Sequence, residues 1–367
     1  MTDPTALTLR EAAAAIVQGK LSAEALVDAC LDRVERLQPV LNCFISVTAE
    51  RARKLAREAD TAVKAGRALG PLHGVPLAHK DMFYRAGEVC TCGSKIRRDF
   101  VPDHTATVLA RLDAAGAIEI GHLNMAEFAM GPTGHNEHYG RCRNPWNPDH
   151  ITGGSSSGSG AAIAAALAFG ALGSDTGGSV RLPAAACGVV GIKPTLGRVS
   201  RYGTMPLSHS LDCIGMLARS VGDCARLLSL IAGPDAHDGM ASRRPVPDYE
   251  RGLDEAAQAG GLAGLRIGVP SRYYLDDIDP EVANLIADSR RVLEKRGARV
   301  VDVPVGDHGA LNDLSNAVLW PEAADVHLQW LRERPQDYAK QGRARLLSVW
   351  AFPPRFTAKR CALGRGC

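Results

Sequence analysis

The sequence predicts an α/β architecture, in which helices pack on a β-sheet. Two observations lead to this prediction. Segments with the spacing of amphipathic helices alternate with short apolar segments that are typical of buried strands. In addition, 46% of the 367 residues are hydrophobic, which suffices for the core of one large domain.

Composition excludes several classes of protein. The net charge of +3 is small and dispersed, so neither a nucleic acid nor an acidic membrane surface is indicated as a partner. No apolar segment reaches the roughly 18 residues that a membrane span requires, and no signal peptide is recognisable. The ten cysteines are scattered, so we expect reduced thiols and a cytoplasmic protein.

The first elements are predicted to be helices that pack on the sheet. Thr8 and Glu11 form a capping box that opens the first helix. The second helix begins near Ser22 and is predicted to end at Pro39, because proline removes a backbone donor. A third, charged helix covers about residues 49–65.

Strands and helices then alternate along the chain. Residues 74–80 are predicted to form a buried strand, 103–116 a helix and 117–121 a second strand. The segment 131–150 is rich in Gly, Pro, Asn and His and is predicted to be a long loop, a kind of segment that is usually functional.

Further elements are predicted beyond residue 183. They are strands at about 187–195, 265–270 and 298–303, and helices at about 221–230 and 280–296. Four apolar residues of the last helix are predicted to face inward, namely Val282, Leu285, Ile286 and Leu293.

The chain is organised around residues 153–183. This stretch holds two glycine turns with serines, GGSSSG at 153–158 and DTGGS at 175–179, joined by a short apolar helix. Glycine lets a substrate approach the main chain closely, and converging N–H groups suit a developing oxyanion. A serine there needs a base to become a nucleophile. Lys80 is the candidate base, because burial lowers the pKa of a lysine from about 10.4.

The Lys80 segment, the GGSSSG turn and the run DTGGSVRLPAA, in this order, resemble the amidase signature family of serine hydrolases. The resemblance extends over about residues 9–337 and is strongest over 80–220. It implies a three-layer α/β/α amidase-signature fold, in which a mixed β-sheet lies between two layers of helices. The implied domain covers residues 1–355, with its catalytic core at about 74–220.

By this resemblance, Ser179 is the acyl nucleophile, Ser155 a bridging serine and Lys80 the base. The peptide bond between Gly154 and Ser155 should be cis. Neutral Lys80 would draw a proton from Ser155, which draws one from Ser179, and the same relay would return a proton to the leaving amine. The resemblance therefore implies hydrolysis of a carboxamide through an acyl-enzyme, without a cofactor or metal.

Other residues of the two turns are expected to support this chemistry. The oxyanion hole is expected from the N–H groups of Thr176, Gly177, Gly178 and Ser179. Asp175 and Arg181 are expected to hold the second turn without reacting. Ser156 is expected to be supporting, and it and Ser157 are interpreted as helix-capping or loop hydroxyls.

Alternative chemistries are less favoured. The segment 153–160 lacks both the lysine of GxxxxGK[ST] and the spacing of GxGxxG, which argues against a phosphate-binding loop. The run Cys90-Thr91-Cys92 has no second cysteine pair, which argues against zinc.

Several histidines lie close to the motifs. His135, His138 and His150 would suit a metal or a Ser–His pair, but they lie in a loop and are interpreted as loop residues. His79 should point away from Lys80 on a strand, so we expect it to pack or to support the site.

The substrate is the least determined part of the prediction. Residues 197–203 and Ser210-Leu211-Asp212 resemble the glutaminase subunit of tRNA-dependent amidotransferases. Cys213 departs from that subunit, and the segment 208–213 is closer to stand-alone hydrolases, including indoleacetamide hydrolases. A free-standing amidase acting on a small-molecule amide is therefore favoured, with no nucleic acid or membrane as a direct partner and with a homodimer left open. The glutaminase subunit of a tRNA-dependent amidotransferase and an inactive truncated homologue are the alternatives.

The end of the sequence departs from the pattern of the family. Residues 356–367 lack periodicity, and members of the family normally continue further. We expect an atypical tail that results from truncation or a frameshift, and a protein that is poorly soluble or weakly active.

Overall fold

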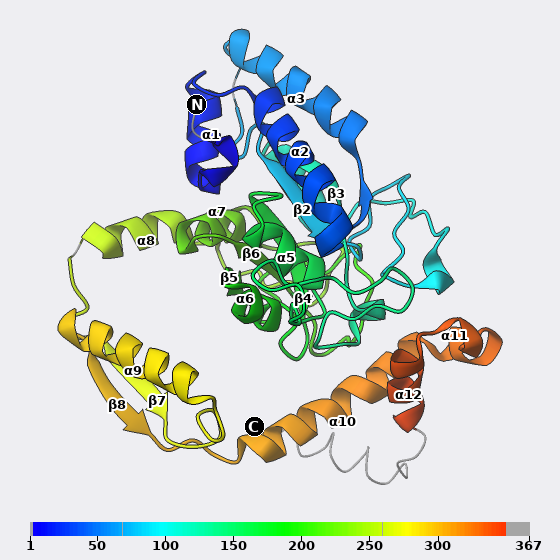
Figure 1. The fold of residues 1–367 in the computed structure, drawn as a ribbon, viewed down its shortest axis with the longest axis vertical. Helices are drawn as coiled ribbons and strands as arrows, with labels where there is room; N and C mark the ends of the chain where they lie inside the picture. The colour runs from blue at the N-terminus through cyan, green and yellow to red at the C-terminus, as the bar shows by residue number, and fades with distance from the viewer. Residues whose placement is uncertain (1–2, 68, 259, 350–367) are drawn as a thin grey trace. The chain divides into compact units, whose positions relative to one another are not determined.

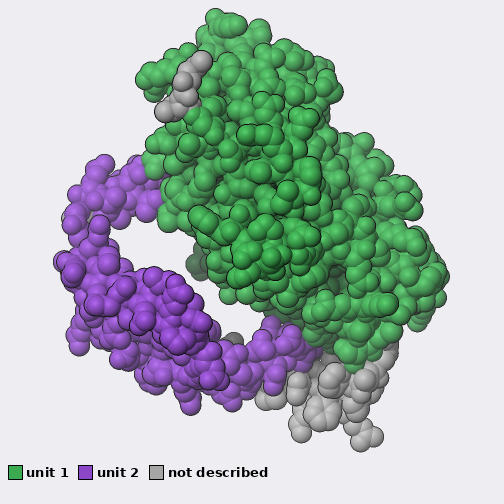
Figure 2. Space-filling view, in the orientation of Figure 1, with its two compact units in different colours: residues 1–249, 319–352 green, residues 250–318, 353–367 purple. Residues whose placement is uncertain are grey.

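The computed structural model describes residues 3–67, 69–258 and 260–349 (Figure 1). They fall into two compact units, shown in different colours in Figure 2. Unit 1 contains the described residues within 1–249 and 319–352, and unit 2 those within 250–318. The single domain expected over residues 1–355 stays a prediction. The atypical tail expected at 356–367 lies outside the described residues.

Unit 1 is built on a six-stranded mixed sheet with the strand order β1-β3-β2-β4-β6-β5. The central strand β2 is parallel to both of its neighbours, β3 and β4, whereas the outer pairs are antiparallel. This confirms the predicted mixed sheet. The strands are β1 (Phe44–Val47), β2 (Pro76–Lys80), β3 (Ile118–Leu123), β4 (Gly170–Asp175), β5 (Val190–Ile192) and β6 (Cys213–Ala218).

The four central strands of this sheet are covered on both faces. Every residue of β2, β3, β4 and β6 is buried, including residues that point to opposite faces of the pleated sheet. Because β2 and β4 are parallel, their carboxyl ends lie at the same edge of the sheet. Lys80 and Asp175, the last residues of these strands, therefore meet at this edge.

The N-terminal helices are α1 (Leu9–Val17), α2 (Ala23–Leu41) and α3 (Ala49–Lys64). The capping box of Thr8 and Glu11 is present at α1, as predicted. The predicted end of α2 at Pro39 is wrong, because the helix continues to Leu41 and ends at Asn42, whose φ is 52°. A proline in the last turn removes one hydrogen bond without blocking the two residues that follow it.

Of the remaining helices of unit 1, α5, α6 and α7 contact strands of the sheet. The helix α5 follows the first turn, and α6 begins two residues after Ser179. The helix α10 runs from unit 2 into unit 1. Their bounds are α4 (Thr107–Ala114), α5 (Ser157–Ala164), α6 (Arg181–Cys187), α7 (Val221–Ile231), α10 (His308–Val326), α11 (Leu328–Glu333) and α12 (Lys340–Ser348). Short 3-10 helices lie at Pro4–Ala6, Lys95–Arg97, Glu127–Ala129 and Pro335–Asp337.

Unit 2 holds a separate two-stranded parallel sheet of β7 (Arg266–Pro270) and β8 (Arg299–Val303). The helix α9 (Pro280–Lys295) connects the two strands, and α8 (Tyr249–Gln258) precedes them along the chain. A salt bridge of 2.8 Å between Arg290 and Asp302 joins α9 to β8.

The predicted inward face of α9 is largely wrong. Val282, Leu285 and Ile286 are 47%, 60% and 38% exposed, and Leu293 is half-buried. A sheet of two strands offers a narrow surface, so within unit 2 it covers only one edge of the helix.

Among the described residues, none of the helices is long and apolar enough to cross a membrane. Eight described cysteines are buried and form no disulfide.

Leu172, fully buried in β4, tests the packing of the sheet. We expect Leu172→Ala to lower the free energy of unfolding by about 2–5 kcal/mol, because it leaves a cavity between covered faces. Urea denaturation followed by circular dichroism measures the change. Val221→Ala, at a side chain that is 52% exposed, is the matched control and should change it by less than about 0.5 kcal/mol. Equal effects of the two substitutions would contradict the arrangement of the sheet.

Candidate active site

Lys80 lies at the end of β2 with its side chain buried, at 1% exposure. Its Nζ is 2.7 Å from the Oγ of Ser155 and 2.7 Å from the Oγ of Ser174. Among the described residues no carboxylate lies within ion-pair distance of this nitrogen. Two hydroxyls therefore form the immediate surroundings of the amine.

The surroundings of Lys80 lower its pKa from 10.5 to about 7. Burial is the main cause, because it disfavours the charged ammonium, and the negative charges of Asp212 and Asp175 oppose the shift. A neutral amine at hydrogen-bond distance from a serine hydroxyl can accept its proton. The geometry and the pKa thus suit a base.

The first glycine turn places the Ser155 hydroxyl next to this amine. The peptide bond between Gly154 and Ser155 is cis, as predicted. Ser155 is fully buried, and its carbonyl oxygen accepts a hydrogen bond from the Ala126 N–H at 3.1 Å. A Cβ atom at Gly154 would lie 2.5 Å from the carbonyl oxygen of Gly131, so only glycine fits where the 131–150 loop meets the turn.

The second turn carries Ser179, which is half-buried. The Ser156 N–H donates to the Ser179 carbonyl oxygen at 3.2 Å, which joins the two turns through the main chain. Among the described residues the Ser179 hydroxyl makes no hydrogen bond, with Ser155 or with any other group. The structure thus brings Lys80 and Ser155 into contact, whereas the Ser179 hydroxyl has no hydrogen-bond partner among the described residues.

Asp175 organises the second turn from within. Its buried carboxylate accepts hydrogen bonds from the N–H groups of Gly178 at 2.8 Å and Val180 at 3.1 Å, and from Arg181 Nε at 3.0 Å. Burial raises the pKa of Asp175, but the hydrogen bonds and the charge of Arg181 outweigh it and keep the pKa low. The carboxylate therefore holds the turn in its charged form.

This arrangement corrects the expected role of Gly178. Its N–H points to Asp175 and is not free to face an oxyanion. Among the described residues the N–H groups of Gly177 and Ser179 have no hydrogen-bond partner. They are the donors that the turn leaves open.

The hydroxyls of Ser156 and Ser157 were expected to be helix-capping or loop hydroxyls, and the helix-capping role is wrong. Ser156 lies at the N-cap of α5, but its side chain makes no cap bond. Its Oγ accepts from the Ser174 N–H at 3.3 Å, and Ser157 donates to the Asn124 carbonyl oxygen at 3.3 Å. The two side chains thus tie the first turn to β4 and to the segment after β3.

Sequence reasoning missed two residues of the site. Ser174, next to Asp175 in β4, contacts Lys80, and Asp212 accepts a hydrogen bond of 2.5 Å from the Thr176 hydroxyl. The pairing of β2 with β4 would have revealed Ser174, but β4 itself was not predicted. Asp212 also borders a cavity of about 320 Å³ that is lined by Arg201, Pro206 and His209 among others.

The histidines near the motifs have structural partners. His79 Nδ1 accepts the Leu172 N–H at 3.2 Å, and burial lowers the pKa of His79 to about 4, as suits a neutral packed ring. His138 contacts Glu127 at 2.8 Å, and His135 contacts Thr133 at 2.9 Å. Among the described residues no group of three or more His, Cys, Asp and Glu side chains is arranged to hold a metal ion.

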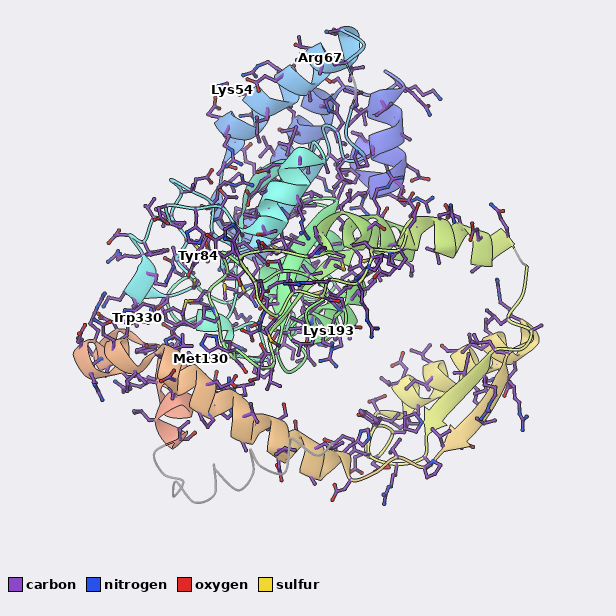
Figure 3. All side chains as sticks on the ribbon, turned by 180° about the vertical axis from the view of Figure 1, so that it is seen from behind. Lys54, Arg67, Tyr84, Met130, Lys193 and Trp330 are labelled. Carbon is purple, nitrogen blue, oxygen red and sulfur yellow. The ribbon has the colours of Figure 1, made fainter. Side chains whose placement is uncertain are left out.

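Two further side-chain contacts of unit 1 involve Lys193 and Trp330, which are labelled in Figure 3. Lys193, after β5, reaches the Sγ of Cys213 at 3.9 Å. Trp330 of α11 stacks on Phe128 with ring centroids 5.5 Å apart. The segment after β3 is thereby held against the last helices of unit 1.

Comparisons with known proteins agree on one family. The family model described as Amidase matches residues 25–352. The chain is 48% identical over 296 residues to the A-subunit of the glutamyl-tRNA(Gln) amidotransferase of Chromohalobacter salexigens, covering 81% of this chain and 60% of that protein. It thus spans about 60% of the length of the curated relatives it matches.

Solved structures show the same likeness. A chain from a vestigial protein complex that bears on the evolutionary origins of an s-triazine catabolic enzyme is 37% identical, with a TM-score of 0.92. The match covers 98% of this chain and 77% of that one. The peptide amidase of Stenotrophomonas maltophilia is 34% identical, with a TM-score of 0.84, over 94% of this chain and 75% of that one.

The low pKa of Lys80 predicts a dependence of stability on pH. Between about 7, the pKa in the folded protein, and 10.5, that of an exposed lysine, the unfolded chain binds more protons. The free energy of unfolding should therefore rise with pH in this range, by up to about 1.4 kcal/mol per pH unit. Lys80→Met should lack this rise, as measured by urea denaturation at several pH values. Equal slopes for the two proteins would show that Lys80 has an ordinary pKa.

Proposed function

This chain belongs to the amidase signature family, and from that premise we propose that it hydrolyses a carboxamide to a carboxylic acid and ammonia or an amine. The observation that supports the proposal best is the 2.7 Å contact between the buried amine of Lys80 and the Ser155 hydroxyl. Acyl transfer requires a base that takes up a proton and N–H groups that stabilise an oxyanion. Lys80, which has no ion-pair partner among the described residues, can be the base, and the second glycine turn provides open N–H groups.

The proposed reaction begins with attack of the Ser179 hydroxyl oxygen on the carbonyl carbon of the amide. Ser155 takes the proton of Ser179 and gives its own to neutral Lys80. The negative charge on the former carbonyl oxygen is stabilised by the open N–H groups of Gly177 and Ser179 and by that of Thr176.

The intermediate then collapses with cleavage of the C–N bond. The proton returns from Lys80 through Ser155 to the leaving nitrogen, and an ester of Ser179 remains. Water attacks this ester by the same relay and releases the acid. Ser174, the second hydroxyl at the Lys80 amine, keeps the amine directed toward the relay.

Two observations support different substrates. The departure at Cys213 favours a free-standing amidase. The 48% identity to the A-subunit of an amidotransferase supports the glutaminase role more strongly. We therefore propose glutamine as the first amide to test, with the chain serving as the ammonia-releasing member of a larger assembly. The second candidate is a small-molecule amide hydrolysed by the free chain. In that case the chain could act as a homodimer.

The relay predicts a characteristic pH profile. Because neutral Lys80 is required, kcat/KM for ammonia release should rise with pH through about 7 and then level off. Ser179→Ala should lower the rate by about 10⁴-fold or more. Ser289→Ala, which removes an exposed hydroxyl that donates to the Leu285 carbonyl oxygen within α9, is the matched control and should keep the wild-type rate. Activity that survives Ser179→Ala would refute the mechanism.

A screen of amides decides between the substrate candidates. Ammonia release is measured from glutamine, asparagine, aliphatic amides and arylacetic amides, first with the chain alone. The glutamine series is then repeated with the partner proteins of an amidotransferase and charged tRNA. The glutaminase proposal expects glutamine hydrolysis that increases strongly on addition of the partners. Turnover of an arylacetic or aliphatic amide by the chain alone, with no response to the partners, would instead support the free-standing enzyme.

A further inference from the structure

The turn at residues 207–212 lies against the second glycine turn and is organised around one carboxylate. Asp212 Oδ2 accepts the N–H groups of Leu207 at 2.8 Å and Ser208 at 3.0 Å. Its Oδ1 accepts the hydroxyl of Thr176 at 2.5 Å. Thr176 directly precedes Gly177, whose N–H is one of the open donors. A shift of Asp212 would therefore move Thr176 and, with it, the Gly177 N–H.

A second carboxylate holds this turn from outside. Glu322 lies in the part of α10 that belongs to unit 1, between Leu319 and Ala323, which are buried. It accepts hydrogen bonds from the hydroxyls of Ser208 and Ser210 and from the Ser210 N–H at 2.9 Å. All three donors come from the 207–212 turn.

The charge on Glu322 is part of this arrangement. Burial raises its pKa, but the hydrogen bonds from Ser208 and Ser210 outweigh burial and lower the pKa. An ionised carboxylate only accepts hydrogen bonds, so both oxygens can receive donors at once. Ser208 is fully buried, and a buried hydroxyl that loses its acceptor is costly. The charged Glu322 carboxylate therefore satisfies donors of the turn that would otherwise lack an acceptor.

We infer that Glu322 is a positioning residue for the catalytic turn. It acts through the 207–212 turn and Asp212 on Thr176, and so on the donors that face the oxyanion. This inference rests on the proposed function, because it concerns the rate of acyl transfer at Ser179. It makes a residue of α10 part of the machinery, although α10 contributes no side chain to the relay of Lys80, Ser155 and Ser179.

The test replaces Glu322 by Gln, which has nearly the same shape. The NH₂ group of Gln can only donate, so it cannot accept the three hydrogen bonds that Glu322 accepts. For the amide identified in the screen, kcat should fall by about 10- to 100-fold while KM changes little, because displaced donors affect the transition state more than binding. Glu322→Asp retains the charge and should recover part of the rate. Ser210→Ala removes the hydroxyl of the contact and should give a smaller loss.

A second readout is independent of any amide. Phenylmethanesulfonyl fluoride reacts with an activated serine: the serine oxygen bonds to sulfur, fluoride leaves, and the hydroxyl proton passes to the relay and then to water. Intact-mass spectrometry measures the rate of labelling, and Ser179→Ala identifies the labelled residue. We expect Glu322→Gln to slow the labelling of Ser179 by about tenfold or more.

The matched control is Glu333→Gln, which removes a carboxylate of α11 that contacts Gln329. It should leave labelling, kcat and melting temperature unchanged. Wild-type labelling of Glu322→Gln, or an equal loss in Glu333→Gln, would overturn the inference. If Glu322→Gln is unfolded at the assay temperature, Ser210→Ala takes its place in the test. A wild-type kcat and labelling rate in Ser210→Ala would then count against the inference.

The outcomes also separate this inference from the proposed function. If no amide is hydrolysed but Ser179 is labelled and Glu322→Gln slows the labelling, the amidase proposal fails and the role of Glu322 stands. If amides are hydrolysed and Glu322→Gln has the wild-type kcat, the function stands and the inference fails. If wild-type Ser179 is not labelled at all, Ser179 is not an activated nucleophile and both are contradicted.

Discussion

The burial of the Lys80 amine is the constraint on which the rest of the site depends. An ammonium group removed from water without a carboxylate in contact is unfavourable, so the folded chain favours the neutral amine. A neutral amine still needs partners, and the hydroxyls of Ser155 and Ser174 supply them at 2.7 Å. The same burial that makes a charged Lys80 costly for the fold leaves a neutral amine that can accept a proton.

The sheet explains why these groups meet. Three consecutive parallel strands, β3, β2 and β4, end at one edge, and the glycine turns are attached to that edge. Parallel strands buried on both faces are closely covered by helices, which excludes water from Lys80. The main-chain bond from Ser156 to Ser179 then fixes one turn on the other. The rigid elements thus set the geometry of the candidate site, and the two turns carry its serine hydroxyls and open N–H groups.

The sequence indicated the mixed sheet, the first helices, Lys80 and the cis bond before Ser155, because each has a local or motif-based signal. It did not reveal Ser174, whose role depends on the pairing of β2 with β4. Nor did it show that Gly178 donates to Asp175, since the direction of an N–H group in a turn depends on the final backbone conformation. The misassigned face of α9 has the same origin. A helical spacing of apolar residues shows that a face exists, but its burial depends on the surface that the rest of unit 2 provides.

The residues that carry out a reaction need further side chains to hold them in position. In this site three carboxylates hold the second glycine turn. Asp175 holds the second turn from within, through N–H groups on both sides of Ser179. Asp212 holds it from the side through Thr176, and Glu322 holds Asp212 in turn through Ser208. Both aspartates also oppose the fall in the pKa of Lys80. Asp175 and Asp212, which order the second turn, therefore raise the pKa of Lys80, whereas burial lowers it. Burial is the larger effect, so the pKa of Lys80 stays below its ordinary value.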